Sequence, residues 1–239
     1  MKTKSTLFIF LLLSTISFGQ SYSIEYEMVQ VSKQINLKTV INTYLNGNDS
    51  FSIYEEDFTG SKASGNEENE NLSLNQNTIF FKDLKNNTVF YKDQIRFKFF
   101  TIEDKNVKIE WVLKNDYKTI LGYSCQKATT TFRGREFNVY FAKDIPIADG
   151  PWKLNGLPVL ILEVASDDSI ASFFIQVKQI KFSKEKKEYV NKYEKLNNIT
   201  YVEFKSLYIE KYEESLYKIV NAEGETRPMN KGFIEYYIE

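Results

Sequence analysis

Five carboxylates lie close together in sequence between residues 144 and 168 and are a first set of groups that could do chemistry. They are Asp144, Asp149, Glu163, Asp167 and Asp168. Paired carboxylates can act as general acid and base, or bind Ca²⁺ through oxygen, although the spacing of a calcium loop is absent. Asp149 precedes a Gly-Pro pair, and Asp167-Asp168 separates two apolar segments. The pattern therefore favours turn residues whose carboxylates accept local backbone N–H hydrogen bonds.

Glu163 differs from the other four because it interrupts the apolar run Val159–Val164. By strand alternation it shares a face with the residues two and four positions before it. On a core face, a carboxylate needs a partner or its pKa rises. Arg133, Arg135 and Lys153 are the candidate partners near in sequence. The favoured interpretation is a structural ion pair, and a solvent-exposed side chain or a functional acid are the alternatives.

Three further side chains could contact a ligand. Arg133 and Arg135 flank Gly134 in a tight turn and could hold a carboxylate or phosphate bidentately, or they could be solvated or paired with the sheet. Trp152 could be a stacking platform for a ligand, or it could plug the end of the sheet. Trp152, Arg133, Arg135 and Glu163 are therefore the candidate ligand-binding residues.

The chain contains no histidine and one cysteine, Cys125. Ser-His-Asp and Cys-His catalysis and histidine-ligated metal sites are therefore excluded. We predict no catalytic residue, no metal site and no cofactor. Because Cys125 cannot form an internal disulfide, we interpret it as a small buried hydrophobe, with a reactive thiol or an intermolecular bridge as the alternative.

The N-terminus has the pattern of a secretory signal peptide over residues 1–19. Lys2 and Lys4 precede an apolar run, Leu7–Phe18, and small residues follow, with cleavage expected after Gly19. The run is shorter than the ~20 residues of a spanning helix, and no later segment could span a membrane. We expect an exported protein, periplasmic or extracellular. Without Lys2 and Lys4, the 31 basic residues fall to 29 against 32 acidic ones, which argues against nucleic acid binding.

Period-two alternation of aromatic and β-branched residues recurs through residues 20–183 and predicts an antiparallel meander of nine or ten strands. Turns are expected at Asn46–Asp49, Lys85–Asn87, Asn115-Asp116 and Arg133–Arg135. One expected strand, Val107–Leu113, places its odd-numbered residues on one face. The segment Thr59–Asn77 has no aromatic residue and predicts an exposed, mobile loop. The expected strands or strand pairs are Tyr22–Val29, Leu37–Glu56, Thr78–Leu84, Thr88–Asp93, Gln94–Asp104, Val107–Leu113, Tyr123–Phe132, Glu136–Ala142, Val159–Val164 and Ser169–Phe182.

Residues 184–239 change to helical periodicity and predict a helical extension that packs on the sheet. Thr200 to Glu203 has a capping-box pattern, and Gly224 and Pro228 lie beyond the expected helix. The segment Lys184–Lys195 is either a solvated, helical connector or a basic interaction surface. The apolar stripe of the helix comprises Phe204, Leu207, Tyr208, Tyr212, Leu216 and Ile219.

The segment Ile120–Val164 resembles the signature block of the GLPGLI family, a group of exported proteins of Bacteroidetes-type bacteria that is also filed under a Porphyromonas-derived name. Val159 replaces the second glycine of the motif that names the family. A β-branched residue disfavours positive φ, so we expect extended backbone there and a strand that begins after Pro158. The matching residues are Gly122, Tyr123, Cys125, Lys127, Ala128, Phe132, Arg133, Gly134, Arg135, Ile145, Pro146, Ile147, Gly150, Pro151, Trp152, Lys153, Gly156, Leu157 and Pro158.

The resemblance implies a fold but no reaction. The implied fold is mainly β, a strongly curved antiparallel sheet similar to the half-barrels of periplasmic lipoprotein carriers, with helical elements on the concave side. Apolar residues on both strand faces, as at Phe80-Phe81 and Phe99-Phe100, indicate two buried surfaces. We therefore expect a non-enzymatic binding protein for a hydrophobic small molecule or lipid.

Two alternatives belong to other classes of function. A partner-binding accessory of outer-membrane transport or surface assembly would use exposed edge strands and the loop Thr59–Asn77. A carboxylate-based enzyme, or one that uses Cys125, has the least support in the sequence because histidine is absent.

Overall fold

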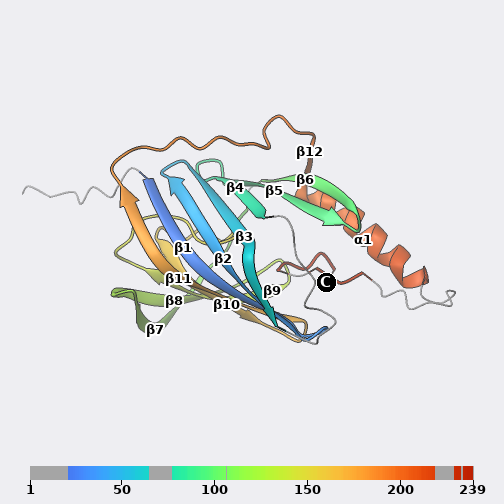
Figure 1. Ribbon diagram of the computed structural model, residues 1–239, viewed down its shortest axis with the longest axis horizontal. Helices are drawn as coiled ribbons and strands as arrows, with labels where there is room; N and C mark the ends of the chain where they lie inside the picture. Colours follow the sequence, from blue (N-terminus) through green and yellow to red (C-terminus); the bar gives the residue numbers. More distant parts are fainter. Residues whose placement is uncertain (1–20, 65–76, 106, 219–228, 233, 239) are drawn as a thin grey trace, which may run out of the picture.

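A computed structural model describes residues 21–64, 77–105, 107–218, 229–232 and 234–238. These residues form one twelve-stranded sheet and one helix (Figure 1). The helix α1 spans Tyr201–Lys218. The strands are β1 Ser21–Ser32, β2 Leu37–Asn48, β3 Phe51–Ser64, β4 Thr78–Asp83, β5 Thr88–Ile95, β6 Lys98–Lys105, β7 Val112–Ile120, β8 Tyr123–Phe132, β9 Arg135–Ala142, β10 Leu160–Asp167, β11 Ala171–Ser183 and β12 Asn198–Thr200.

Alternating side chains make this sheet one-sided. In β1, Tyr22, Ile24, Tyr26 and Met28 are all buried, while the residues between them are partly exposed. The strand order is β12-β6-β5-β4-β3-β2-β1-β11-β10-β9-β8-β7. Two meanders, β1 to β6 and β7 to β11, are therefore joined through the antiparallel β1–β11 pair in the middle of the sheet.

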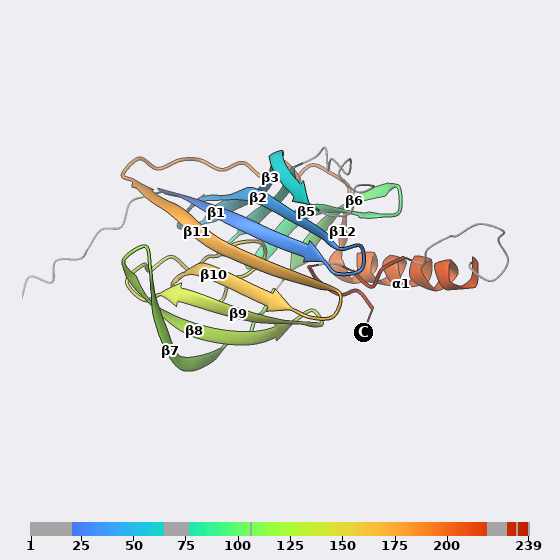
Figure 2. The ribbon, with the colours of Figure 1, turned by 60° about the horizontal axis from the view of Figure 1, so that its bottom comes forward.

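The sheet is strongly curved and encloses its core. Figure 2 shows it bending from β5 and β6 at the back, through β1 and β11, to β8 and β7 in front. One hydrophobic cluster contains Tyr54 from β3, Tyr91 from β5 and Val139 from β9, so both meanders face the same interior. The predicted fold, a mainly β, strongly curved sheet of half-barrel type with a C-terminal helix, is confirmed.

The segment between β9 and β10 turns into this interior. Trp152 and Leu157 are buried there, as the sequence predicts. Trp152 has a positive φ of 55°, so the Gly-Pro corner bends sharply enough to turn the indole inward. Val159 is not among the described residues with positive φ, so the expectation that it avoids a left-handed backbone is confirmed. Residues 157–159 form a bend, however, and β10 begins at Leu160, one residue later than expected.

The predicted turn at Asn115-Asp116 is wrong, because both residues lie within β7. The chain reverses instead at Leu121-Gly122, where φ is 49° and 84°. Irregular pairing with β8 between Leu113 and Tyr117 accommodates the polar residues without a reversal. The local turn preference of Asn-Asp is thus overridden by pairing along the whole of β7.

The predicted strand Val107–Leu113 is also displaced. Residues 107–111 precede β7 and belong to no strand, although Val107 and Ile109 are buried as expected. The Trp111 indole donates a hydrogen bond to the carbonyl oxygen of Asn155 (2.8 Å), which holds this segment against the corner. Leu113 lies on the edge strand with 57% of its surface exposed, so the expected common face is not maintained.

The expected loop and extension differ from the structure in part. Residues 59–64 continue β3, and residues 62–64 pair with residues 38–40 of β2, because backbone pairing does not require apolar side chains. Residues 65–76 of the expected loop and the expected signal segment, 1–19, lie outside the described residues. The segment 184–197 is irregular rather than helical, and β12 then joins the sheet parallel to β6.

The capping box at the start of α1 is confirmed. The Thr200 backbone N–H and hydroxyl donate to Glu203 Oε2 at 2.7 and 2.8 Å, and the Glu203 N–H donates back to Thr200 Oγ1 at 3.2 Å. Phe204 and Tyr208 are buried against the sheet, but Leu216 is 42% exposed, so the described part of the predicted stripe docks only in its first half. Ile219, Gly224 and Pro228 lie outside the described residues. Within the described part of the chain, no helix has both the length and the apolar character that crossing a membrane requires.

We predict that Gly150→Ala lowers the free energy of unfolding by about 1–3 kcal/mol, because a Cβ there would lie 2.9 Å from both Cβ and Cδ1 of Ile161. Urea denaturation measures the change. Ile161→Val alone should cost about 0.5–1.5 kcal/mol. Because the valine lacks Cδ1, the double variant should lose less than the sum of the two single variants. If the two losses in the free energy of unfolding are strictly additive, Gly150→Ala does not act through contact with Ile161.

Candidate functional site

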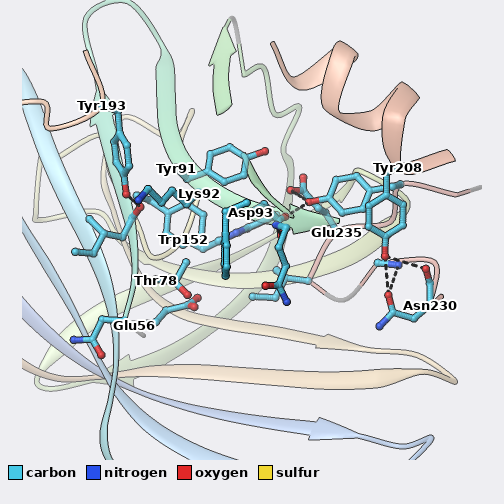
Figure 3. A pocket seen from close by; sticks show the side chains of 18 of the residues that line it. Glu56, Thr78, Tyr91, Lys92, Asp93, Trp152, Tyr193, Tyr208, Asn230 and Glu235 are labelled. Atoms are coloured by element: carbon cyan, nitrogen blue, oxygen red, sulfur yellow. Dashed lines mark hydrogen bonds between the residues drawn. The ribbon is translucent and has the colours of Figure 1, made fainter. Parts of the chain in front are cut away.

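A cavity of about 1030 Å³ opens on the concave side of the sheet. Strands β3, β4 and β5, the segment before β12, the corner, α1 and the C-terminal segment all contribute to its walls. Figure 3 shows Glu56 and Thr78 at one side, Tyr208 with Asn230 at the other, and Trp152 and Asp93 between them. Aromatic rings and carboxylates thus share one lining. The aromatic lining residues are Phe80, Tyr91, Phe99, Trp152, Tyr193, Tyr208 and Tyr237.

Glu56 is the most unusual group in this lining. It follows Ser52 and Tyr54 on the buried face of β3, and it is only 5% exposed. Its Oε1 atom has no hydrogen-bond partner among the described residues. Burial, with a smaller contribution from the charge of Asp93, raises the pKa of Glu56 to about 7. Near neutral pH this carboxyl group is therefore able both to donate and to accept a proton.

The aromatic lining is held firmly in place. Tyr91 stacks on Phe80 with ring centroids 5.5 Å apart, and its hydroxyl has no hydrogen-bond partner within the described part of the chain. Trp152 packs against Phe132 and Phe137 with centroids 5.9 and 5.7 Å apart. The two interpretations of Trp152 are therefore compatible, because the indole fills the end of the core and also lines the cavity.

An ion cluster of Arg133, Asp104, Glu235 and Lys153 adjoins the cavity, and its Glu235 also lines the cavity. Arg133 Nη2 contacts both Asp104 carboxylate oxygens at 2.8 Å, and Nη1 contacts Glu235 Oε2 at 3.1 Å. Lys153 Nζ lies 2.5 Å from Glu235 Oε1. The cluster joins β6, the β8–β9 turn, the corner and the C-terminal segment, so it fixes the relative positions of four parts of the chain.

Charge compensation within the cluster is visible in the pKa values. Burial would raise the pKa of Glu235, but Lys153 and Arg133 together hold it below its ordinary value. Burial lowers the pKa of Lys153 and raises that of Asp104. Glu235, which contacts both cations, therefore stays ionised in spite of its burial.

Tyr237 links the ion cluster to the cavity. Its hydroxyl lies 2.5 Å from Asp93 Oδ2 and 3.0 Å from Glu235 Oε1. A tyrosine hydroxyl has one proton to donate, so it can donate fully to only one of these carboxylates. Burial raises the pKa of Asp93, so this carboxylate binds a proton more readily than an exposed aspartate does. A protonated Asp93 would donate to Tyr237, which would in turn donate to Glu235.

The five carboxylates between residues 144 and 168 do not form one site. Asp149 is buried, accepts the Gly150 N–H and the Tyr22 hydroxyl at 2.8 Å each, and pairs with Lys82. Asp168 accepts the N–H groups of residues 170 and 171 at 2.8 and 3.0 Å, as expected of a turn residue. Asp167 is exposed and pairs with a lysine at the surface. The predicted role as a turn residue is thus confirmed for Asp168. Asp149 accepts one local N–H as predicted, but it is a buried residue whose main partners, Lys82 and Tyr22, are distant in sequence.

Glu163 forms an ion pair, but with a partner other than those expected. Lys118 Nζ lies 2.5 Å from Glu163 Oε1, and the Gln176 side chain donates to Oε2 at 3.1 Å. A register shift in the pairing of β10 with β9 lies between Ile161 and Glu163. Because such a bulge changes the strand alternation, Glu163 does not share a face with Ile161, and Lys153 and the two arginines are out of reach.

The two arginines also have structural partners. The Arg133-Gly134 turn has φ values of 52° and 77°, as a two-residue hairpin requires, and directs Arg133 into the ion cluster. Arg135 is buried, lies 2.9 Å from Asp168 Oδ2 and donates to the Tyr236 hydroxyl at 2.7 Å. Of the four predicted ligand-binding residues, only Trp152 lines the cavity.

The structure also locates Cys125 and several buried carboxylates that the sequence analysis missed. Cys125 is fully buried, and burial raises the pKa of its thiol, in agreement with its interpretation as a small hydrophobe. The sequence interpretation missed Glu56, Asp93 and Asp104, which alternate in phase with buried residues of their strands. This alternation can be read from the sequence and would have predicted that the three carboxylates face the interior. Glu235 follows no strand alternation, and no local pattern indicates its burial.

Comparison with known proteins gives a family and a fold. A family model described as the N-glycanase peptide, N-terminal domain, matches residues 24–203. No curated protein matches the chain. The structure of PNGF-II in space group P21 has 15% identity and a TM-score of 0.51, over 80% of this chain and 34% of that chain. The C2 form has 16% identity and a TM-score of 0.49, over 80% and 33%.

A DUF1329 family protein from Desulfovibrio piger is more distant, with 9% identity and a TM-score of 0.20 over 69% of this chain and 86% of that chain. The chain spans about a third of the length of the PNGF-II chain. At this identity the likeness to PNGF-II shows the fold alone.

We predict that Glu56→Gln changes the pH dependence of stability. The pKa of Glu56 is about 7 when folded, above its ordinary value of 4.5, so the folded state binds more protons between these values and the wild-type protein loses stability as pH rises through this range. The variant should lack this loss, which is about 3 kcal/mol at pH 8 relative to pH 4. Urea denaturation at several pH values measures it. Glu55→Gln, on the same strand, is the matched control, and equal changes in both variants would contradict the assignment to Glu56.

Glu235→Gln should lower the free energy of unfolding by about 3–5 kcal/mol, because it leaves two buried cations with one carboxylate fewer. The control is Asp167→Asn, which breaks the surface pair with Lys33 and should cost less than about 1 kcal/mol. Thermal or urea denaturation compares the two. A similar small loss in both would mean that the cluster does not hold the C-terminal segment in place.

Proposed function

Because the chain belongs to the family of N-glycanase N-terminal domains, we propose that it binds the oligosaccharide part of a glycoprotein in the cavity of Figure 3, without cleaving it. The observation that carries the proposal is the lining itself. Aromatic side chains such as Tyr91 and Trp152 line the cavity beside buried polar atoms that lack partners within the described residues, Glu56 Oε1 and the Tyr91 hydroxyl.

A saccharide satisfies both kinds of lining group. Its C–H faces pack on aromatic rings, and its hydroxyl groups donate to carboxylates and exchange hydrogen bonds with phenols. A purely apolar ligand would leave Glu56 unsatisfied at a cost of about 1–3 kcal/mol or more. The polar lining therefore supports a saccharide better than the hydrophobic ligand expected from the sequence. The volume lies at the upper end of the range for small-molecule sites.

A carboxylate-based enzyme is the second candidate. It is favoured by the presence of Glu56 and Asp93 in one cavity, with the pKa of Glu56 raised to about 7, where a general acid or base works best. We place binding first because a bound ligand alone would give partners to the two lining atoms that are unpaired within the described residues, Glu56 Oε1 and the Tyr91 hydroxyl.

Three expectations from the sequence remain part of the proposal. They are membership of the GLPGLI family, export through residues 1–19, and a role beside a partner in outer-membrane transport or surface assembly. The edge strand β7 supports a partner, because Val112, Leu113 and Tyr117 are each more than half exposed along it.

The proposal predicts that the protein binds a neutral biantennary N-glycan in isothermal titration calorimetry. Glu56→Gln should weaken binding about 10-fold or more, since a hydrogen bond to a charged group is lost, and Tyr91→Phe about 3- to 10-fold. Tyr44→Phe removes a hydroxyl that does not line the cavity and is the matched control.

Fatty acids should bind no better than the buffer blank. Absence of glycan binding at millimolar concentration, or preferential binding of fatty acids, would refute the saccharide proposal.

A further inference from the structure

Three basic side chains, Lys92, Arg96 and Lys192, line the cavity and are exposed to solvent, so they stand at its mouth. Lys92 comes from β5, Arg96 from the turn that follows it, and Lys192 from the irregular segment before β12. None of the three forms an ion pair with another residue of the described ranges. Elements far apart in sequence therefore bring three unpaired cations to one rim.

Such an arrangement is electrostatically unfavourable in the unliganded protein. The pKa of Lys192 is lowered, first by partial burial and then by the neighbouring charge of Lys92, and Glu55 opposes this only in part. Single exposed lysines are usually just solvated, but two that repel each other at a cavity mouth gain stability when an anion arrives. The turn conformation of Arg96, with φ of 56°, keeps a third cation at the same mouth.

The deep part of the cavity has the opposite character. Glu56, Asp93 and Glu235 line it, and the buried cation Lys153 is already paired with Glu235. An anionic group would therefore lose its hydration there without gaining an unpaired cation, while neutral hydroxyl groups can donate to the carboxylates. The lining therefore orients a bound ligand, with its neutral rings in the deep part of the cavity and any negative charge at the mouth.

We propose that the cavity takes an acidic oligosaccharide, with neutral sugar rings against Glu56 and Tyr91 and a terminal carboxylate at the mouth against Lys92, Arg96 and Lys192. This inference rests on the proposed function and specifies its ligand class. Arg96 can hold a carboxylate bidentately, and the two lysines add charge. Phe99, 59% exposed beside them, offers an apolar edge to the same terminal sugar.

The test compares a sialylated biantennary N-glycan with its desialylated form by calorimetry at 50 mM salt. The sialylated form should bind about 5- to 20-fold more tightly, as expected for two or three partly exposed ion pairs. At 500 mM salt the ratio should fall towards 1, because screening weakens exposed charge pairs. The double variant Lys92→Gln/Lys192→Gln should remove most of the preference at low salt, because its affinity for the sialylated glycan should fall several-fold more than its affinity for the neutral glycan.

Lys98→Gln and Lys195→Gln are the matched controls, since both lysines are exposed and do not line the cavity. Lys98 begins β6, the strand after β5, and Lys195 lies in the same irregular segment as Lys192. Both controls should keep the wild-type preference. Equal binding of the two glycans by the wild-type protein, or a loss of preference in the controls as large as in the double variant, would overturn the acidic ligand while leaving saccharide binding in place. Failure of both glycans to bind would overturn the proposed function itself, and the acidic ligand with it.

Discussion

Two buried cations, Arg133 and Lys153, set the constraint on which the interior depends. A charge inside an aromatic core must be paired, and the available carboxylates are Asp104 on β6 and Glu235 near the C-terminus. The β8–β9 turn, the corner and the C-terminal segment can meet only where all four groups are in contact. Because such clusters are often no more stabilising than apolar packing, we infer that this one mainly specifies geometry. It decides which segments close the curved sheet and therefore where the cavity lies.

The cavity follows from that closure. The C-terminal segment is held by Glu235 and supplies Tyr237, whose hydroxyl reaches Asp93 on β5. The corner is held by Lys153 and supplies Trp152. Groups that stabilise the fold and groups that face the cavity are thus neighbours along the same short segments. The inner carboxylates and the basic mouth then give the cavity a charge gradient along its depth, and this gradient distinguishes it from the uniformly apolar pocket expected from the sequence.

Much of the sheet was predictable, because strand alternation is a local signal. The boundaries of β8 follow directly from it. The failures have a common cause in non-local pairing. The irregular β7–β8 register absorbs Asn115-Asp116, and the bulge in β10 changes the face on which Glu163 lies. The phase of Glu56 with Tyr54 was readable, whereas the burial of Glu235 depends on contacts with residues about a hundred positions away, such as Arg133, that no local pattern encodes.

The position of β1 in the middle of the sheet has a consequence for folding. Its residue Ser21 pairs with Asn48 on one side and with Ser183 on the other, so the first strand gains its second neighbour only from the eleventh. Long-range pairing of this kind is slow, since much chain must be ordered before the contact forms. A chain synthesised from its N-terminus can complete the β1–β2 hairpin early, but β1 remains an open edge until β11 is available. Closure of the sheet is therefore a late, whole-chain event, and the unfinished protein presents an aggregation-prone strand edge until then.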